Sequence, residues 1–408
     1  MIDIFHIDSY AVANSCKANP KRTPIMQSPV ISNQFDSGNI EIIDASDPHH
    51  IKLAISKDNA SDFLQFFHFR LEAAVGETCK ISIVNAGDSS YPAGWPDYNV
   101  CTSWDRSDWF RTPCTYVNGV LSFEIEMTQN SVYFSYFTPY SHERHLDLLS
   151  WAQGDTRVTN QTLGLTLDGR AMSMLRISDT ETPKRKAWII ARQHPGETMA
   201  EWFVEGFLHS LLDEDNPAAR KLLNDTAFYV VPNMNPDGSA RGNLRTNAAG
   251  ANLNREWQTP TMSTSPEVYL VRERMIAEGG DLFLDIHGDE ELPYNFVAGC
   301  EGNPSYDDRH AKLEKRFKNT YMGISPDFQD THGYPKDEAG QADLRIAANW
   351  LGEHFKTLSF TIEMPFKDNA DLPNPARGWS GERSAQLGRD VLFPIAKTFR
   401  LMNRLDDS

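Results

Sequence analysis

A histidine and a glutamate three residues apart, His194 and Glu197, stand where an apolar run, KAWIIAR, passes into an amphipathic segment. An imidazole and a carboxylate at such a turn can converge on one cation, while Pro195 and Gly196 set the turn. A second histidine, His287, follows another apolar run, DLFLDI. Three protein ligands and an open fourth position are typical of a catalytic zinc, because a structural zinc is normally closed by four ligands. Since H-x-x-E also occurs by chance at helix starts, the alternative is a surface histidine beside a glutamate.

Glu363 ends a third apolar run, LSFTIEM, between Ile362 and Met364. Burying a carboxylate among apolar side chains is costly unless the group is paired or functional. A carboxylate whose pKa is raised by burial can take a proton from a water and pass it to a leaving amine. The alternative is a salt-bridged glutamate at a sheet edge, facing solvent.

A long polar loop carries three arginines, Arg241, Arg245 and Arg255, together with Asn254. The loop is rich in turn formers such as NPDG and GNLR, and loops on rigid scaffolds often carry function. The planar guanidinium can grip a carboxylate with two hydrogen bonds, and a neighbouring asparagine can supply a further donor. The alternative is a solvated basic loop.

After about residue 140, strand-like apolar runs alternate with helical patterns, which is typical of an α/β sheet covered on both faces. We expect strands at residues 186–192, 227–231, 281–286, 294–298 and 358–364, and helices at residues 197–212, 265–279, 305–321 and 384–405. In open α/β sheets, ligands bind beyond the carboxyl ends of the strands. His194 and His287 are therefore in the expected place.

Residues 35–137 have an apolar period close to two, as in LQFFHFRLE and LSFEIE. Short strands separated by turn-rich loops predict an antiparallel β-sandwich. Residues 1–34 are rich in proline with little periodicity, and are expected to form an N-terminal arm. The larger α/β domain is expected to span residues 138–408.

The composition excludes several classes of partner. Of the 408 residues, 40% are apolar and 23% charged, as in soluble globular proteins. With 56 acidic against 39 basic residues, the net charge of −17 opposes binding to nucleic acid. No apolar run approaches the roughly 18 residues of a membrane span, and MIDIFHIDSY lacks the features of a secretory signal. We therefore expect a cytoplasmic protein with no membrane partner, whose five cysteines are reduced thiols.

Six motifs, HPGE, NPDG, GNLR, NLNREW, DIHG and SFTIEMPF, together resemble the motif series of the zinc carboxypeptidases. The similarity is to the cytosolic carboxypeptidase subfamily, which includes tubulin deglutamylases. FDSGNI near residue 36 and VYFSYFTPYSHERHLDLL from residue 132 resemble segments that open and close that subfamily's N-terminal β-sandwich. The resemblance covers about residues 35–400. It implies an α/β, mixed-sheet zinc carboxypeptidase catalytic domain preceded by an antiparallel β-sandwich.

The same resemblance implies the roles of the candidate residues. His194, Glu197 and His287 would bind one zinc ion per chain. Glu363 would be the general base and acid of a metallocarboxypeptidase that acts on the C-terminal tails of peptides or proteins.

Arg245 would polarise the scissile carbonyl and stabilise the oxyanion, while Asn254 and Arg255 would hold the terminal carboxylate of the substrate. The requirement for a free carboxylate implies release of single C-terminal residues. Arg345, in QADLRIAANW, falls near the position where deglutamylating enzymes place a basic residue in the side-chain pocket. If it lines that pocket, acidic C-terminal residues such as glutamate are preferred, against the alternative of an arginine on a helix surface.

Three positions depart from the family pattern or match it incompletely. Family members usually carry aspartate at the position of Asn252, where the carboxylate orients a zinc-binding imidazole. A second H-x-x-E joins His287 to Glu290, which we interpret as a loop residue because Glu197 already supplies the third ligand. Tyr334 is a candidate for the family's mobile active-site tyrosine.

Two other functions remain open from the residues. A zinc amidohydrolase of the aspartoacylase type, acting on small N-acyl amino acids, uses a similar set of side chains, but the N-terminal sandwich argues against it. A catalytically inactive protein could use the same site to bind carboxylate tails. Glu363 together with an intact ligand set favours catalysis.

Overall fold

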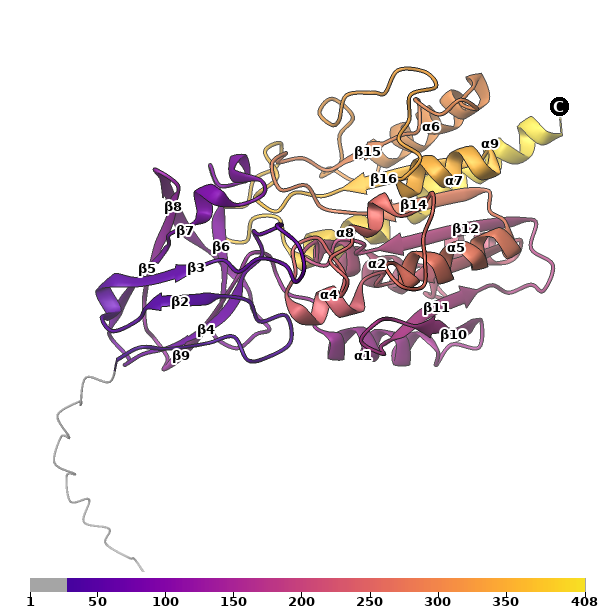
Figure 1. Cartoon of the computed structure of the whole chain (residues 1–408). Helices are drawn as coiled ribbons and strands as arrows, with labels where there is room; N and C mark the ends of the chain where they lie inside the picture. Colours follow the sequence, from indigo (N-terminus) through magenta and orange to yellow (C-terminus); the bar gives the residue numbers. More distant parts are fainter. Residues whose placement is uncertain (1–27, 408) are drawn as a thin grey trace, which may run out of the picture.

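The computed structural model describes residues 28–407 and shows a β-rich domain beside a larger α/β domain (Figure 1). Within these residues, the strands of the first domain are β1 (Val30–Ser32), β2 (Glu41–Asp44), β3 (Ile51–Ala54), β4 (His68–Glu72), β5 (Thr78–Ile83), β6 (Asn99–Ser103), β7 (Phe110–Val117), β8 (Val120–Glu126) and β9 (Ser131–Ser135). They are joined in the order β1-β4-β9-β6-β7-β8-β5-β3-β2. Strand β7 connects two sheets, because its first half pairs with β6 and its second half with β8.

The pairing in this domain differs in one respect from the expected antiparallel sandwich. All neighbouring strands are antiparallel except β3 and β5, which are parallel, with Ile51 opposite Ile81. Between them the chain forms β4, which lies in the other sheet. The chain thus leaves one sheet and returns in the same direction, as a parallel pair requires.

The expected N-terminal arm falls largely on residues 1–27, which lie outside the described residues. Its last part includes β1, which pairs with β4, so the sheet begins before residue 35. The division of the chain at residues 34 and 137 stays a prediction.

A mixed sheet forms the centre of the second domain. In the described chain its strands are β10 (Val158–Leu165), β11 (Ala171–Ile177), β12 (Arg185–Ala191), β13 (Thr226–Val231), β14 (Leu282–Ile286), β15 (Phe296–Ala298) and β16 (Leu358–Glu363), in the order β10-β11-β13-β12-β14-β16-β15. The central strands β13, β12, β14 and β16 are parallel, and their neighbours on both sides are antiparallel. The mixed sheet implied by the family resemblance is confirmed.

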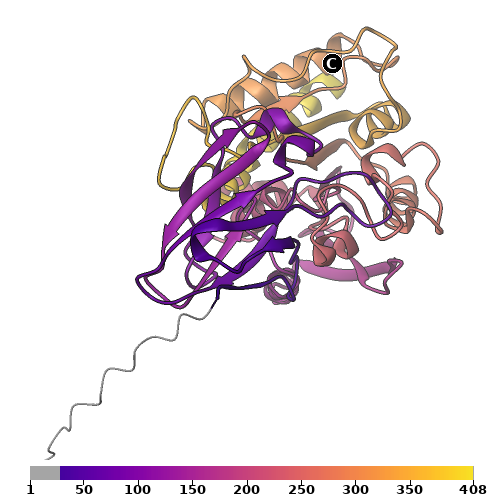
Figure 2. The same cartoon turned by 60° about the vertical axis from the view of Figure 1, so that its left-hand side comes forward.

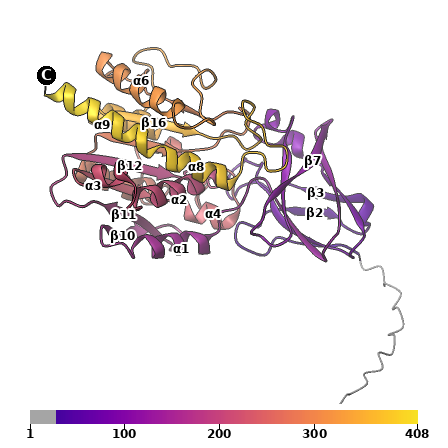
Figure 3. The ribbon, with the colours of Figure 1, turned by 180° about the vertical axis from the view of Figure 1, so that it is seen from behind.

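Helices cover both faces of this sheet (Figures 1 and 3). Those found in the described part of the chain are α1 (His142–Ala152), α2 (Met199–Leu211), α3 (Pro217–Leu223), α4 (Pro236–Arg241), α5 (Pro266–Glu278), α6 (Asp308–Met322), α7 (Ala347–Phe355), α8 (Gly381–Asp390) and α9 (Leu392–Asp406). Strand β12 shows the two faces: Trp188 and Ile190 lie in the core that α5 and α7 join, whereas Ala187 and Ile189 lie in the core that α2 joins. The sheet is therefore buried on both sides, as its near-continuous apolar strands predict.

The expectation of a single helix at residues 384–405 was wrong. The structure has α8 and α9 instead, interrupted at Val391. Pro394 explains the break, because it has no N–H to donate and its ring crowds the carbonyl of Asp390, four residues earlier.

Two further observations concern the described residues alone. Among them, no helix combines the length and apolar character needed to cross a bilayer. The thiols of Cys79, Cys101, Cys114 and Cys300 are free, while Cys16 lies outside the described residues.

Candidate active site

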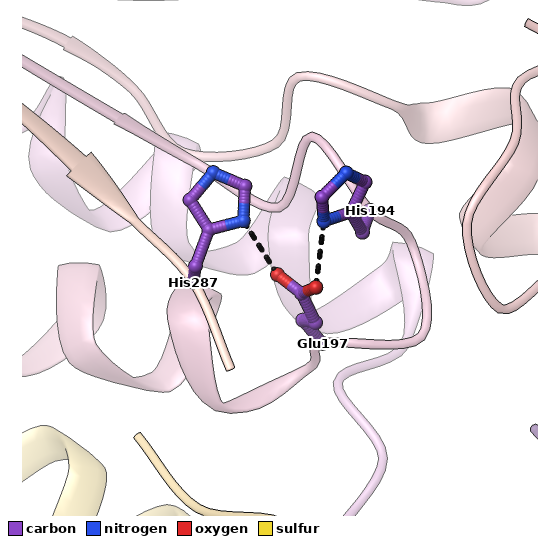
Figure 4. A group of neighbouring side chains, drawn as sticks. All are labelled: His194, Glu197 and His287. Carbon is purple, nitrogen blue, oxygen red and sulfur yellow. Dashed lines mark hydrogen bonds and ion pairs between the residues drawn. The ribbon is translucent and has the colours of Figure 1, made fainter. Parts of the chain in front are cut away.

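The two candidate zinc-binding histidines follow neighbouring parallel strands. His194 comes three residues after β12 and His287 directly after β14, and these strands pair in register from Ala187 with Leu282 to Ala191 with Ile286. Their carboxyl ends therefore deliver both imidazoles to the same edge of the sheet. Glu197 lies between them, just before α2 begins (Figure 4).

The turn that carries His194 is held by close backbone contacts. Gly196 donates its N–H to the carbonyl of Leu244 at 2.9 Å, and a Cβ at this position would lie 2.9 Å from the same oxygen. The buried Arg192 guanidinium donates to the carbonyl of Pro195 at 2.9 Å and pairs with Glu201 at 2.8 Å. These contacts fix the turn before any ligand binds.

The three side chains form a compact, buried group. The Nδ1 atoms of His194 and His287 lie 2.6 and 2.7 Å from the two carboxylate oxygens of Glu197. One donor atom from each residue lies within 4.8 Å of the others. Two imidazole nitrogens and one carboxylate oxygen are a donor set that suits a catalytic zinc, so the residues present fit this metal.

The outward nitrogens of both rings also have partners. The Nε2 atom of His287 lies 2.9 Å from a carboxylate oxygen of Asp285, and that of His194 lies 3.1 Å from the amide oxygen of Asn252. Each ring nitrogen bonded in this way directs Nδ1 toward Glu197, as the partners of metal-binding histidines do. Asn252 occupies the place where the resemblance implied an orienting partner, with an amide instead of a carboxylate.

The surroundings shift the pKa values of the three groups in different directions. Burial and the nearby Arg245 charge lower the pKa of His194 to about 4, against the attraction of Glu197. Burial alone would lower the pKa of His287, but the Asp285 and Glu197 carboxylates raise it well above its ordinary value. Burial disfavours the ionised form of Glu197, yet the two histidines hold its pKa below its usual range.

A cavity of about 640 Å³ opens beside this group. Its lining includes most of the residues singled out from the sequence, namely His194, Glu197, Arg245, Asn254, Arg255, His287, Tyr334 and Glu363. Arg345, which the sequence also suggested for the side-chain pocket, is not among the lining residues. Its side chain is 59% exposed and pairs with Asp343 at 2.8 Å.

Glu363 is the last residue of β16 and points into the cavity wall rather than into solvent. It is buried, and its Oε2 atom has no hydrogen-bond partner among the described residues. Burial raises the pKa of Glu363 well above its ordinary value, opposed by His287 and reinforced by Glu197. The solvent-facing alternative is therefore not what the structure has.

Cations and an amide gather at one end of the cavity. Arg255 donates to the carbonyl of Asn254 at 2.7 Å, and burial together with the charge of Arg245 lowers its pKa. The amide oxygen of Asn254 accepts from the N–H of Ala347 at 2.9 Å, which leaves its NH2 group near His287, 3.4 Å from Nε2. Two guanidinium groups and an amide form a suitable site for an anion.

Two loop residues also reach the cavity: Tyr334, between α6 and α7, and Glu290, between β14 and β15. Tyr334 lines it and donates its hydroxyl to Asp289 at 2.6 Å. Glu290 lies in a loop, as expected, but it is buried in the cavity wall, and burial with the nearby Glu197 charge raises its pKa to about 8. The candidate metal-binding group contains Glu197 and not Glu290.

Two parts of the chain match known families. Residues 31–137 match the cytosolic carboxypeptidase N-terminal domain, and residues 149–381, more than half of the 408 residues, match the zinc carboxypeptidase family. The chain belongs to the zinc carboxypeptidase family. The resemblance found in the sequence is confirmed, and this zinc carboxypeptidase is an enzyme of the peptide hydrolase class.

Solved structures of bacterial relatives are similar to this zinc carboxypeptidase along nearly its whole length. A metallo-carboxypeptidase from Burkholderia cenocepacia is 46% identical with a TM-score of 0.89, covering 92% of this chain and 100% of the other. One from Pseudomonas aeruginosa, in complex with (2-guanidinoethylmercapto)succinic acid, is 48% identical with a TM-score of 0.88, covering 90% and 98%. Cytosolic carboxypeptidase 3 of Mus musculus is 26% identical over 321 residues, covering 70% of this chain and 32% of its own length.

Two residues of the zinc carboxypeptidase site were not predicted from the sequence. Asp285 lies two residues before His287, a spacing that places both side chains on the same face of an extended chain, so a signal was present. Tyr91 lines the cavity from the β-sandwich. No local pattern marks Tyr91, because only the packing of the two domains brings it there.

Proposed function

We propose that this zinc carboxypeptidase releases single C-terminal residues from peptides or proteins. The observation that carries the proposal is one cavity in which the His194, Glu197 and His287 group, the buried Glu363 and the two cavity arginines face the same space. A zinc hydrolase that acts at chain ends needs its metal, a base and a carboxylate site within reach of one peptide bond.

His194, Glu197 and His287 would hold one zinc ion per chain. When bound, zinc supplies a Lewis acid and lowers the pKa of water at the site. The remaining chemistry belongs to the protein. Glu363, desolvated and without a partner in the described residues, takes a proton from the attacking water and returns it to the leaving amine.

Arg245 and Arg255 have different roles in this proposal. Arg245 lies between the candidate metal-binding group and the sandwich. There its guanidinium holds the negative charge that develops on the scissile carbonyl oxygen. Asn254 and Arg255 hold the terminal carboxylate of the substrate, which restricts cleavage to the last peptide bond. The Pseudomonas relative's ligand contains a succinic acid, whose two carboxylates are consistent with a carboxylate site in such a cavity.

The proposed preference for acidic C-terminal residues loses the support of Arg345, because that side chain lies outside the cavity. A further cation in the cavity lining, Lys318, is buried. Lys318 already pairs with Glu314 at 2.9 Å and Asp330 at 3.1 Å, so an acidic side chain would compete with two carboxylates for it.

The two alternative functions account for fewer features of the structure. An aspartoacylase-like amidohydrolase gives no role to the sandwich, which here matches the N-terminal domain of cytosolic carboxypeptidases. An inactive tail-binding protein gives no role to the buried Glu363. Similarity to cytosolic carboxypeptidases supports a cytoplasmic location as a further proposal.

The test compares the wild type with Glu363→Gln and with the control Glu353→Gln, a substitution on α7 outside the cavity lining, at a side chain that pairs with Lys356 and accepts from the N–H of Ser305 at 2.9 Å. Metal content is measured, and peptides ending in Glu, Lys and Phe are digested. We expect about one zinc in every protein, trimming by single residues in the wild type and control, and a kcat about 1000-fold lower in Glu363→Gln. Trimming by Glu363→Gln at the wild-type rate would refute the role of the base. Equal rates on the three peptides, or faster cleavage of Lys or Phe, would remove the acidic preference.

A further inference from the structure

The loop that carries Arg245 is anchored to the β-sandwich as well as to its own domain. The loop between β3 and β4 extends from the β-sandwich toward the α/β domain (Figure 2). Asp58, in this loop, is buried, and its carboxylate contacts the loop that carries Arg245. One carboxylate oxygen accepts from the N–H of Leu244 at 2.6 Å, and the other accepts from the N–H groups of Arg245 and Thr246 at 2.8 and 2.9 Å. The Thr246 hydroxyl adds a fourth bond at 3.0 Å.

The next residue of the sandwich continues the same interface. The amide of Asn59 donates to the carbonyls of Asn247 and Ala248 at 3.2 and 2.7 Å, and its oxygen accepts from Asn243 at 2.7 Å. Asp58 and Asn59 therefore hold the backbone on both sides of Arg245. Because four donors converge on Asp58, only its ionised form can accept them all.

The sandwich also supplies the surroundings of the Arg245 guanidinium. The rings of Phe63 and Tyr91 lie 5.5 and 5.7 Å from its central carbon, within the range of cation–π attraction. The backbone of Tyr91 is fixed in turn by the buried Gln65, whose amide donates to its carbonyl at 3.0 Å and accepts from its N–H at 2.8 Å. Within residues 28–407, no carboxylate forms an ion pair with Arg245, so its N–H donors stay available to a ligand in the cavity.

We propose that the N-terminal sandwich is part of the catalytic apparatus, with Asp58 as a positioning residue that sets the place of Arg245, and with Phe63 and Tyr91 as the wall against which the guanidinium rests. This inference rests on the proposed carboxypeptidase function. A transition state is stabilised only by donors that already stand where its charge develops. The sandwich supplies that preorganisation from a separate domain, through bonds to the main chain.

The proposal predicts which kinetic constant changes. Arg245 acts on the charge of the transition state, whereas Asn254 and Arg255 hold the substrate carboxylate. Loss of the Asp58 carboxylate should therefore lower kcat and leave KM nearly unchanged. Asp58→Asn keeps the shape of the side chain but turns an NH2 group toward main-chain donors, which shifts the loop. A displacement of about 1 Å can cost up to about 100-fold in rate, so we expect a kcat about tenfold to 100-fold lower.

The experiment uses the full chain, with zinc bound, as wild type, Asp58→Asn, Arg245→Ala and the double variant. Asp62→Asn is the matched control, because Asp62 lies in the same loop, is 96% exposed and pairs with Lys57. Zinc content, the thermal midpoint, kcat and KM are measured for each protein. Binding of a phosphonate peptide analogue, which carries a tetrahedral anion, is compared with binding of the free C-terminal amino acid.

We expect Asp58→Asn to lower kcat and to weaken phosphonate binding by similar factors, with normal zinc content and amino-acid binding. In the Arg245→Ala background the same substitution should have little further effect, because both changes remove one function. Independent, multiplicative losses, or an unchanged kcat in Asp58→Asn, would overturn the proposal.

If Asp58→Asn does not fold, the wall is tested instead. Tyr91→Ala should lower kcat more than Tyr91→Phe does, because phenylalanine keeps the ring against which the guanidinium rests. Equal activity of these two variants would also overturn the proposal. A wild type that trims no peptide would instead refute the carboxypeptidase function itself, so the two failures are distinct.

Discussion

Replacing Asp285 with asparagine should weaken zinc binding about tenfold to 100-fold. Asp285 is completely buried, and its carboxylate lies 2.9 Å from Nε2 of His287 and 2.7 Å from the amide nitrogen of Gln193. A hydrogen bond to a charged group contributes roughly 1.5–3 kcal/mol, and a neutral one roughly 0.5–1.5 kcal/mol. The midpoints of these two ranges differ by about 1.25 kcal/mol, which corresponds to nearly a tenfold loss, at the lower end of the range found for the partners of metal-binding histidines.

The structure offers the reverse experiment at the other histidine. Asn252 accepts from His194 at 3.1 Å and also accepts the N–H of Asn254 at 3.1 Å. Aspartate would keep both bonds and add the missing charge. We therefore expect Asn252→Asp to bind zinc about tenfold more tightly than the wild type.

Zinc affinity is measured by competition with a chromophoric chelator at one pH, for the wild type and both variants. Asp281→Asn is the control, because Asp281 lies just before the same strand and pairs with Arg185 at 2.8 Å, away from the histidines. Unchanged affinity in Asp285→Asn, or weaker binding in Asn252→Asp, would refute the reasoning that the charge of the partner sets the basicity of the ring.

Two further predictions concern stability. Burial raises the pKa of Glu267 to about 7, so the folded state disfavours its ionised form, and this cost grows as the pH rises from about 4.5 to 7. Glu267→Gln should therefore raise the thermal midpoint at pH 8 and have little effect at pH 4, with an upper limit of about 3 kcal/mol from the pKa shift; equal effects at both pH values would contradict this. Gly388→Ala would place a Cβ 1.9 Å from the carbonyl oxygen of Phe203, where α8 meets α2, and should destabilise the fold by about 3 kcal/mol. Gly323→Ala is its control, since φ is −73° and the nearest atom is 3.4 Å away, and a similar loss in both variants would show that the helix contact is not the cause.

The sequence predicted elements well where the pattern was strong and continuous. The strands before His194 and His287 were expected at residues 186–192 and 281–286, and the structure has them at Arg185–Ala191 and Leu282–Ile286. Buried parallel strands are marked by apolar runs, so their position can be found locally. The break between α8 and α9 was overlooked, because an amphipathic pattern continues through Pro394 although the hydrogen bonding does not.

The sequence by itself determined the chemical inventory of the site. His194, Glu197, His287 and Glu363 each follow or end an apolar run, and the topology of a parallel sheet brings the ends of such runs to one edge. The expectation that Arg345 lines the side-chain pocket could not be derived in this way, because it depended on the direction in which one side chain points from a loop.

Only the tertiary structure decided what surrounds these residues. The bonds from Asp58 to the Arg245 loop join residues 186 to 188 positions apart, and Tyr91 reaches the cavity from the other domain. No local pattern of apolar and polar residues encodes such contacts, because they depend on how two separately patterned domains pack against each other. Sequence periodicity reports which face of an element is buried, whereas the partner of that face is set by the packing of the whole chain.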